Sequence, residues 1–579
     1  MQDSNQHHEL NAYVGTIVGE STSREFRLAV AHEAIREQDI IAVDAQLRST
    51  TPGVLPEQLR IWAKVQRIER MNPLFPSEAG HELAATRTDP FDTVLSLSRE
   101  MVTAVCQVLG AERFGTDAVG RLDQLRYPPQ PATRAYRPAS EDLVRVLLGD
   151  LGKNDRRALD IAVLANRPEV DVKVDGHAVV TRHLAILAMT GAGKSWAARR
   201  IVEELAKRQY PIVIFDPHGD YTGLADVKGL GNRVRRYYAQ LPLFEEDADT
   251  VARIVSDLGY GLRDTMRFRF PDVFEAARSF FDCNDTELAK RIASLGELAG
   301  NSVHTYGVQP NMWLIANMAS AGRFAVLDGK TSLVTWDWPE LARYNRRDAA
   351  TLEAIEKRSR SAASVLHRME RINRSIARAA DPLPIDRRQI VGDGSISIIS
   401  LAGYTSDFQA TIYSIIADDL FEARVQDPDS WPVLLVLEEA HNFAPAQSRT
   451  PAESRAITTT RQIAQEGRKF NVGLILISQR PSRLDETTLS QCNSYVIMRM
   501  VNPADQNFVR RVVESLGEDD ARMLPDLDVG EAILSGQLVK FPTLVRLKEP
   551  ESAGEREERD AFAVLDEVRR NNPSSASAR

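Results

Sequence analysis

The sequence predicts an α/β fold with a mainly parallel sheet, preceded by a small β-barrel and interrupted by a helical insertion. Three observations lead to this prediction. Several apolar runs end abruptly in polar residues, which is typical of buried parallel strands. Short strand-like segments separated by turn residues fill the N-terminal part of the chain. Between residues 241 and 385 the pattern becomes mostly helical and charged.

The composition sets the broad class of the protein. The 579 residues are enough for two or three domains, and 43% hydrophobic with 26% charged residues is ordinary for a soluble globular chain. The net charge of −9 argues against a surface that attracts DNA over its whole extent. It is compatible with a ring whose positive charge is concentrated in a pore. Three widely spaced cysteines predict a reducing compartment and no metal-binding cysteine cluster. No apolar run reaches membrane-spanning length, so we expect a cytoplasmic protein without a membrane partner.

The N-terminal segment, residues 1–85, is predicted to be a small β-barrel. Such a barrel either docks a partner or binds an oligonucleotide, and docking is the more common use. Residues 86–155 are expected to be a linker region with helices, because residues 92–109 have helical periodicity and residues 128–138 are rich in proline. The expected strands of the barrel are 13–18, 25–30, 39–43 and 59–65.

The α/β core is expected in two pieces, residues 156–240 and 386–549. Its first piece should contain a hairpin over 170–180 with a turn at Asp175–Gly176. The insertion 241–385 separates the pieces, and its Arg-rich segment 352–378 is more simply a solvated amphipathic helix than a DNA-contacting face. Residues 550–579 should form a charged C-terminal helix and a polar tail. The expected core strands are 158–164, 184–187, 211–215, 395–401, 432–437, 472–478, 494–500, 531–534 and 541–547.

The strand at 184–187 leads into a glycine turn and then a helix, which is the P-loop arrangement. Glycines let backbone N–H groups converge on a phosphate, and the helix N-terminus adds its positive dipole end. Lys194 should reach the β- and γ-phosphates of ATP, and the Ser195 hydroxyl should bind Mg²⁺. Ala188 replaces the usual first glycine, at a strand end that tolerates a methyl group. The expected nucleotide-binding residues are Met189, Thr190, Gly191, Ala192, Gly193, Lys194, Ser195 and Trp196.

Acidic residues follow the apolar strand at 432–437, as hydrolysis of a nucleotide requires. We assign Glu438 to the shell around Mg²⁺ and Glu439 to the activation of water. The usual first acid is aspartate, and a contact through water tolerates the longer side chain. Gln479 ends the next strand, and its amide can sense the γ-phosphate. The simpler alternative is a pair of solvated carboxylates at a strand end.

Six motifs follow one another along the chain: TGAGKS at 190–195, DPHGDY at 216–221, EEAH at 438–441, EGRKF at 466–470, SQRPSRLD at 478–485 and NPADQ at 502–506. Their order resembles the HerA family of the HerA–FtsK ATPase class, over roughly residues 159–547, and the N-terminal strands fit the β-barrel of that family. The resemblance implies a RecA-like core, a homo-hexameric ring with ATP sites between subunits, and double-stranded DNA in the pore. It also implies a partner, either a NurA-like nuclease in DNA-end resection or a defence effector enzyme in an anti-phage complex.

A site between subunits needs an arginine supplied in trans. Arg468 is the first candidate and Arg461 the second, seven residues apart and so on one face of a helix. Both could instead be solvated helix arginines.

Three functions compete at this point. The leading prediction is an ATP-driven motor that translocates on or unwinds double-stranded DNA. The second is a ring scaffold that binds ATP to assemble and activate an effector. The third, a metabolic P-loop kinase, is disfavoured because small kinases lack the long insertion and the barrel.

Overall fold

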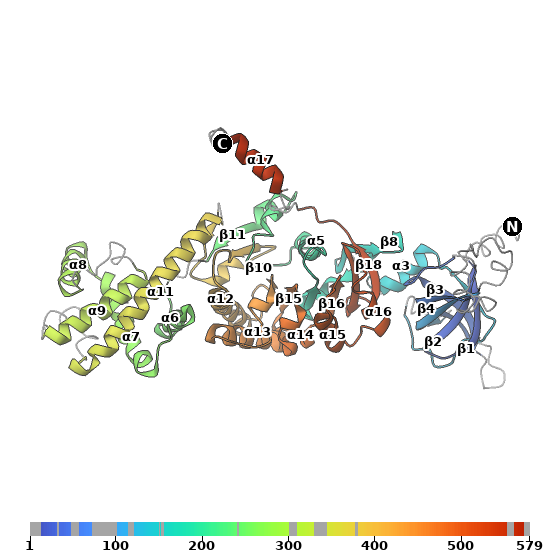
Figure 1. Cartoon of the computed structure of the whole chain (residues 1–579), viewed down its shortest axis with the longest axis horizontal. Coiled ribbons are helices and arrows are strands. Elements are labelled where there is room, and N and C mark those ends of the chain that lie inside the picture. Colours follow the sequence, from blue (N-terminus) through green and yellow to red (C-terminus); the bar gives the residue numbers. More distant parts are fainter. Residues whose placement is uncertain are drawn as a thin grey trace, which may run out of the picture. The chain divides into compact units, whose positions relative to one another are not determined.

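The structure is a computed structural model, and its helices and strands are labelled in Figure 1. The chain divides into two compact units. The first unit comprises residues 1–204, 479–482 and 492–550, and the second comprises residues 205–478, 483–491 and 551–579. In the described part of the chain, no helix is both long and apolar enough to cross a membrane. The described residues are 13–31, 34–47, 57–71, 101–113, 121–149, 151, 156–239, 243–299, 310–328, 344–376, 380–552 and 561–571.

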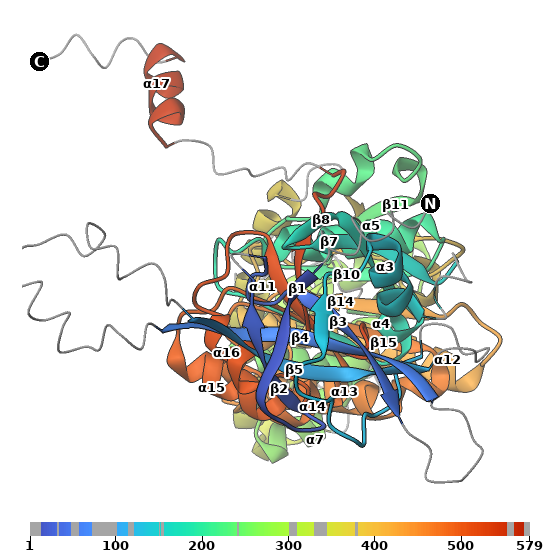
Figure 2. The ribbon, with the colours of Figure 1, turned by 90° about the vertical axis from the view of Figure 1, so that its right-hand side faces the viewer.

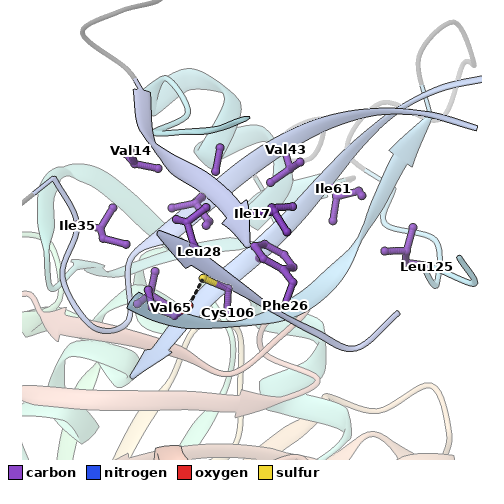
Figure 3. Packing of buried hydrophobic residues seen from close by; sticks show 14 of the residues in the cluster. Val14, Ile17, Phe26, Leu28, Ile35, Val43, Ile61, Val65, Cys106 and Leu125 are labelled. Atoms are coloured by element: carbon purple, nitrogen blue, oxygen red, sulfur yellow. Dashed lines mark hydrogen bonds between the residues drawn. The ribbon is translucent and has the colours of Figure 1, made fainter. Parts of the chain in front are cut away.

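The first unit begins with a closed antiparallel barrel of strand order β1-β2-β5-β4-β3-β6, drawn mainly in blue in Figure 2. Its interior is apolar, and Figure 3 shows Phe26, Leu28 and Val65 among the side chains that fill it. Burial raises the pKa of the Cys106 thiol to about 12, so this residue behaves as a small apolar core residue. The strands are β1 (Tyr13–Ser21), β2 (Glu25–Val30), β3 (Ile40–Leu47), β4 (Glu57–Met71), β5 (Met101–Arg113) and β6 (Arg134–Tyr136).

The barrel therefore extends beyond residue 85, and part of the predicted linker region 86–155 was wrong. Residues 101–109, expected to be helical, belong to strand β5, which pairs antiparallel with both β2 and β4. Two neighbouring strands satisfy its backbone groups, and its β-branched residues fit the pleat, so pairing overrides the helical spacing of its apolar residues. The preceding residues 92–100 lie outside the described residues. The predicted linker region does contain one helix, α3 (Ser140–Leu148).

A buried ion pair fixes the barrel to the rest of the first unit. The Lys64 Nζ atom of β4 donates a hydrogen bond of 2.7 Å to the Oδ1 atom of Asp520, in α16 (Glu518–Met523). The two side chains are 2% and 5% exposed. Gln38 also donates to Asp520, and Lys64 donates to the carbonyl oxygen of Pro542. Each buried charge thus has several polar partners, which is the condition for such a pair to be tolerated.

The first unit also contains strands in the order β9-β16-β17-β18-β7-β8. β16 pairs parallel with β9, and the other pairs are antiparallel. The expected hairpin turn at Asp175–Gly176 was wrong. Asp175 caps the helix α4 (Gly176–Thr181), because its carboxylate accepts the backbone N–H of His177. The strands are β7 (Ala158–Leu164), β8 (Arg167–Asp175), β9 (Leu184–Leu187), β16 (Ser494–Met498), β17 (Glu531–Gly536) and β18 (Thr543–Leu547).

The second unit is built on parallel strands in the order β12-β11-β13-β10-β14-β15. The central strands are buried along their whole length, as the continuous apolar runs predict. The predicted α/β fold with a mainly parallel core and an N-terminal barrel is confirmed. The strands are β10 (Ile212–Asp216), β11 (Val234–Tyr238), β12 (Asp381–Pro382), β13 (Ile396–Ser400), β14 (Val433–Leu437) and β15 (Val472–Ser478), and the helices between them are α12 (Ser406–Gln426) and α13 (Pro451–Phe470).

The described residues of the predicted insertion 241–385 are mostly helical (Figure 1), but Asp381–Pro382 near its end form strand β12 of the sheet. Its longest helix, α11, buries one face that carries Leu352, Ile355, Ala362 and Leu366, so it is an amphipathic helix with a packed side. Residues 553–560 and 572–579 of the predicted C-terminal helix and tail lie outside the described residues. The helices are α6 (Ala248–Val255), α7 (Asp264–Arg278), α8 (Asp285–Ala299), α9 (Met312–Asp328) and α11 (Ala349–Ile376), and α17 (Ala561–Asn571) is near the C-terminus.

Replacing Lys64 with alanine should destabilise the first unit by about 3–5 kcal/mol, because Asp520 is then a buried carboxylate without its cation. The measurement is the unfolding midpoint of the full chain in denaturant. Arg522→Ala is the matched control, since Arg522 pairs with Asp519 from an exposed position on the same helix. Equal stability of the two variants would contradict the anchoring role of Lys64.

Candidate nucleotide-hydrolysis site

The P-loop of the first unit lies between the end of β9 and the start of α5 (Lys194–Lys207). Gly191 and Gly193 have φ values of 80° and 99°, which side chains with a Cβ atom rarely adopt. The Met189 N–H donates to the Arg499 carbonyl oxygen at 3.0 Å, and the Gly530 N–H donates to that of Ala192 at 3.2 Å. Neighbouring backbone therefore fixes both sides of the turn.

The residues expected to bind nucleotide occupy this turn and the first turn of α5. Lys194 and Ser195 are its first two residues and are half-buried, while Trp196 is 48% exposed. Backbone N–H groups at such a helix start, with the positive end of the helix dipole, suit a phosphate. Ala188 is fully buried directly after β9, so its methyl group is accommodated within the packed core.

Gln479 lies against the P-loop. It follows Ser478, the last residue of β15, and its side-chain carbonyl oxygen accepts a hydrogen bond from the Thr190 hydroxyl. Two of the predicted site residues, far apart in sequence, are thus brought together. An amide in this place can exchange its bond to Thr190 for one to a phosphate oxygen or a water molecule.

The two predicted acids directly follow strand β14 of the second unit. Glu438 is fully buried, and Glu439 is 5% exposed. Glu439 has a left-handed backbone with φ of 52°, a conformation that costs of order 1–3 kcal/mol in a residue other than glycine and concentrates at functional sites. The Nδ1 atom of His441 lies 3.3 Å from the Oε2 atom of Glu439. The chain therefore turns sharply after β14 and holds Glu439 in a fixed place.

One residue of this site was missed by the sequence-based assignment. The hydroxyl of Tyr221 donates a hydrogen bond of 2.8 Å to the Oε2 atom of Glu438. The signal that pointed to it was the polar segment 216–221 directly after the apolar strand β10. That position suggested chemistry at the strand end, but nothing in the sequence indicated that a side chain from this segment reaches Glu438.

The two candidate trans-acting arginines differ in their surroundings. The Arg461 guanidinium forms two hydrogen bonds with the carboxylate of Asp485, at 3.0 and 2.6 Å. Asp485 also accepts from the backbone and hydroxyl groups of Thr488, so Arg461 helps to hold the segment after β15. Arg468 is exposed on the last turn of α13. Both arginines are exposed in their own chain, but Arg461 already pairs with Asp485, which favours Arg468 as the group that acts on another subunit.

Each unit, taken by itself, carries an oxygen donor that suits a magnesium ion arriving with a nucleotide. Within the described ranges, no cluster of three or more histidine, cysteine, aspartate or glutamate side chains is arranged to hold a metal. Mg²⁺ commonly takes one or two protein oxygen ligands, with phosphates and water completing its shell. The Ser195 hydroxyl and the Glu438 carboxylate are oxygen donors of the kind this ion prefers.

Comparison with known proteins identifies related chains. The family model described as "Helicase HerA, central domain" matches residues 159–420. A DNA double-strand break repair helicase HerA from Pyrococcus furiosus is 27% identical over 482 residues, covering 77% of this chain and 78% of the relative. A probable helicase from Methanocaldococcus jannaschii is 26% identical over 543 residues, covering 92% of this chain and 95% of the relative.

A solved structure of the bacterial conjugative coupling protein TrwB has 14% sequence identity to this chain. It covers 70% of this chain and 93% of that protein, with a TM-score of 0.42. A likeness at this level adds no argument about function.

Proposed function

We propose that this chain, which belongs to the HerA family and is an ATPase, is an ATP-driven motor that acts on double-stranded DNA. The observation that carries the proposal is the P-loop with Gln479 held against Thr190, in a chain related to helicases over most of its length. The relatives' names supply the DNA substrate, and the residues of the site supply the chemistry of ATP hydrolysis.

The proposed roles follow from the chemistry of each side chain. Lys194 holds the β- and γ-phosphates, and Ser195 and Glu438 would hold Mg²⁺, which would supply positive charge against the phosphates when bound. Glu439 accepts a proton from the attacking water. Gln479 senses the γ-phosphate through its amide.

We also propose that the active form is a homo-hexameric ring in which Arg468 acts on the neighbouring subunit's nucleotide. The exposure of Arg468 on α13 supports this role. A partner nuclease of the NurA kind, or a defence effector enzyme, completes the proposed assembly. The neighbouring gene tests this last point, since a nuclease gene implies DNA-end resection and an effector gene implies anti-phage defence.

Glu439→Gln should retain ATP binding and lose hydrolysis, because an amide cannot accept the proton from water. Lys194→Ala should lose turnover together with tight nucleotide binding, because the loop loses its charged side chain on the phosphates. The measurements are steady-state phosphate release and binding of a fluorescent ATP analogue. Near-normal turnover of the Glu439 variant would remove this residue from the catalytic role.

Mixing Arg468→Ala chains with Glu439→Gln chains should restore part of the activity that each variant lacks. Some interfaces in a mixed ring then combine an intact Arg468 with an intact Glu439. An arginine finger contributes about 10³–10⁵ in rate where it has been isolated, so even partial recovery is measurable. Arg461→Ala mixed in the same way is the control. Mixed rings that form but stay inactive at every ratio would contradict the assignment of Arg468.

ATP hydrolysis should be stimulated by double-stranded DNA without a partner protein, and DNA binding should be electrostatic. The net charge of −9 leaves no broadly attractive outer surface, so affinity must come from a local positive zone. The logarithm of affinity should then fall with the logarithm of salt, by about 0.9 for each phosphate contacted, and two unrelated duplexes should bind alike. The measurement is a titration of both duplexes at several salt concentrations.

Three outcomes of these measurements would contradict the motor. A salt slope near zero, or hydrolysis that responds to the partner protein but not to DNA, would favour the alternative of an ATP-binding ring scaffold. A strong preference for one duplex sequence would also count against a motor, because base-specific contacts would trap it at particular sites.

A further inference from the structure

A tight turn built on a buried carboxylate follows strand β10. Asp216 ends this strand and is 1% exposed. Its Oδ1 atom accepts the backbone N–H groups of His218, Gly219 and Asp220 at 3.1, 2.7 and 3.3 Å, and its Oδ2 atom accepts that of Tyr221 at 3.3 Å. Gly219 has φ of 88°, which the turn requires. One side chain therefore fixes the path of the chain up to Tyr221.

The side chain at the end of this turn reaches the first of the two acids. Tyr221 and Glu438 are both fully buried, and the Tyr221 hydroxyl lies 2.8 Å from the Oε2 atom of Glu438. Strands β10 and β14 pair in parallel with Phe215 opposite Leu437, and the Glu438 N–H donates to the Phe215 carbonyl oxygen at 3.3 Å. The turn and the carboxylate thus leave adjacent strands at the same edge.

The Tyr221 hydroxyl is the donor of this hydrogen bond, because an ionised carboxylate can only accept. A rigid ring that is fully packed carries the hydroxyl, so the acceptor atom has one preferred position. Hydrogen bonds to a carboxylate are among the stronger ones in proteins.

We propose that Tyr221 is a positioning residue, which orients the Glu438 carboxylate for its contact with the nucleotide-bound Mg²⁺, and that the turn on Asp216 exists to hold Tyr221 in place. This inference rests on the assignment of Glu438 to the magnesium shell in the proposed function. The partners of metal-shell groups commonly act in this way, because they set the orientation of the group that faces the ion.

The test uses the full chain and two readouts, one of which is independent of hydrolysis. The first is the factor by which Mg²⁺ tightens the binding of a fluorescent ATP analogue. The second is the Mg²⁺ concentration that gives half-maximal ATP hydrolysis. Tyr221→Phe keeps the packed ring and removes the hydroxyl. This substitution should reduce the factor by which Mg²⁺ tightens analogue binding, and raise the Mg²⁺ concentration for half-maximal hydrolysis, each by about tenfold. The affinity for the analogue without Mg²⁺ should stay as in the parent chain.

Tyr413→Phe is the matched control. Tyr413 is also fully buried in the second unit, and its hydroxyl forms a hydrogen bond of 2.9 Å with that of Thr460 instead of with an acid. Its loss should leave both Mg²⁺ readouts unchanged. In a Glu438→Gln background, Tyr221→Phe should add less than about twofold, because two residues that act through one group are not additive.

The outcomes separate this inference from the proposed function. A Glu438→Gln chain with parent-like Mg²⁺ dependence would remove Glu438 from the metal shell and overturn both. A Glu438→Gln defect together with parent-like behaviour of Tyr221→Phe would overturn the positioning role alone. Two further results would overturn the positioning role. One is a Tyr221→Phe chain that binds the ATP analogue more weakly both with and without Mg²⁺. The other is a Tyr221→Phe effect that is equally large in the Glu438→Gln background, because the substitution would then act on the structure in general.

Discussion

The parallel pairing of β10 with β14 is the constraint on which the chemistry of the second unit depends. Both strands are wholly buried, so their backbone groups must be satisfied by neighbouring strands, and the register is fixed. That register sets Asp216 and Glu438 at the same edge. A slip by one residue would turn the apolar side chains of either strand to the opposite face and separate Tyr221 from its acceptor.

Buried charges recur at the positions that organise this protein, and in each case the surrounding polar groups make the burial tolerable. The Asp216 carboxylate accepts hydrogen bonds from four backbone N–H groups, and the Asp520 carboxylate accepts them from the side chains of Lys64 and Gln38. The buried Asp485 carboxylate accepts two hydrogen bonds from the exposed Arg461 guanidinium. An unpaired buried charge is costly, so these groups specify the arrangement of their neighbours more strictly than apolar packing could.

The sequence was sufficient where structure follows from local patterns. Apolar runs located the buried strands, and in the structure the P-loop, the two acids and Gln479 each follow one of them. The sequence was insufficient where a residue's conformation or contact depends on a segment that is far away along the chain. Strand β5 was mistaken for a helix because its partners β2 and β4 are not visible in its own pattern. Tyr221 is 217 residues from Glu438 in the sequence, and a contact between side chains at that separation leaves no local signal.

The pairing of Lys64 with Asp520 has a consequence for how this chain could be recombined with its relatives. The barrel supplies the cation, and α16, more than 450 residues later, supplies the anion. A chimera that takes the barrel from one relative and the remainder from another would inherit both charges only if the two donors share them. Domain boundaries drawn from the linear sequence would miss this dependence, so the barrel and α16 are best treated as one exchangeable module.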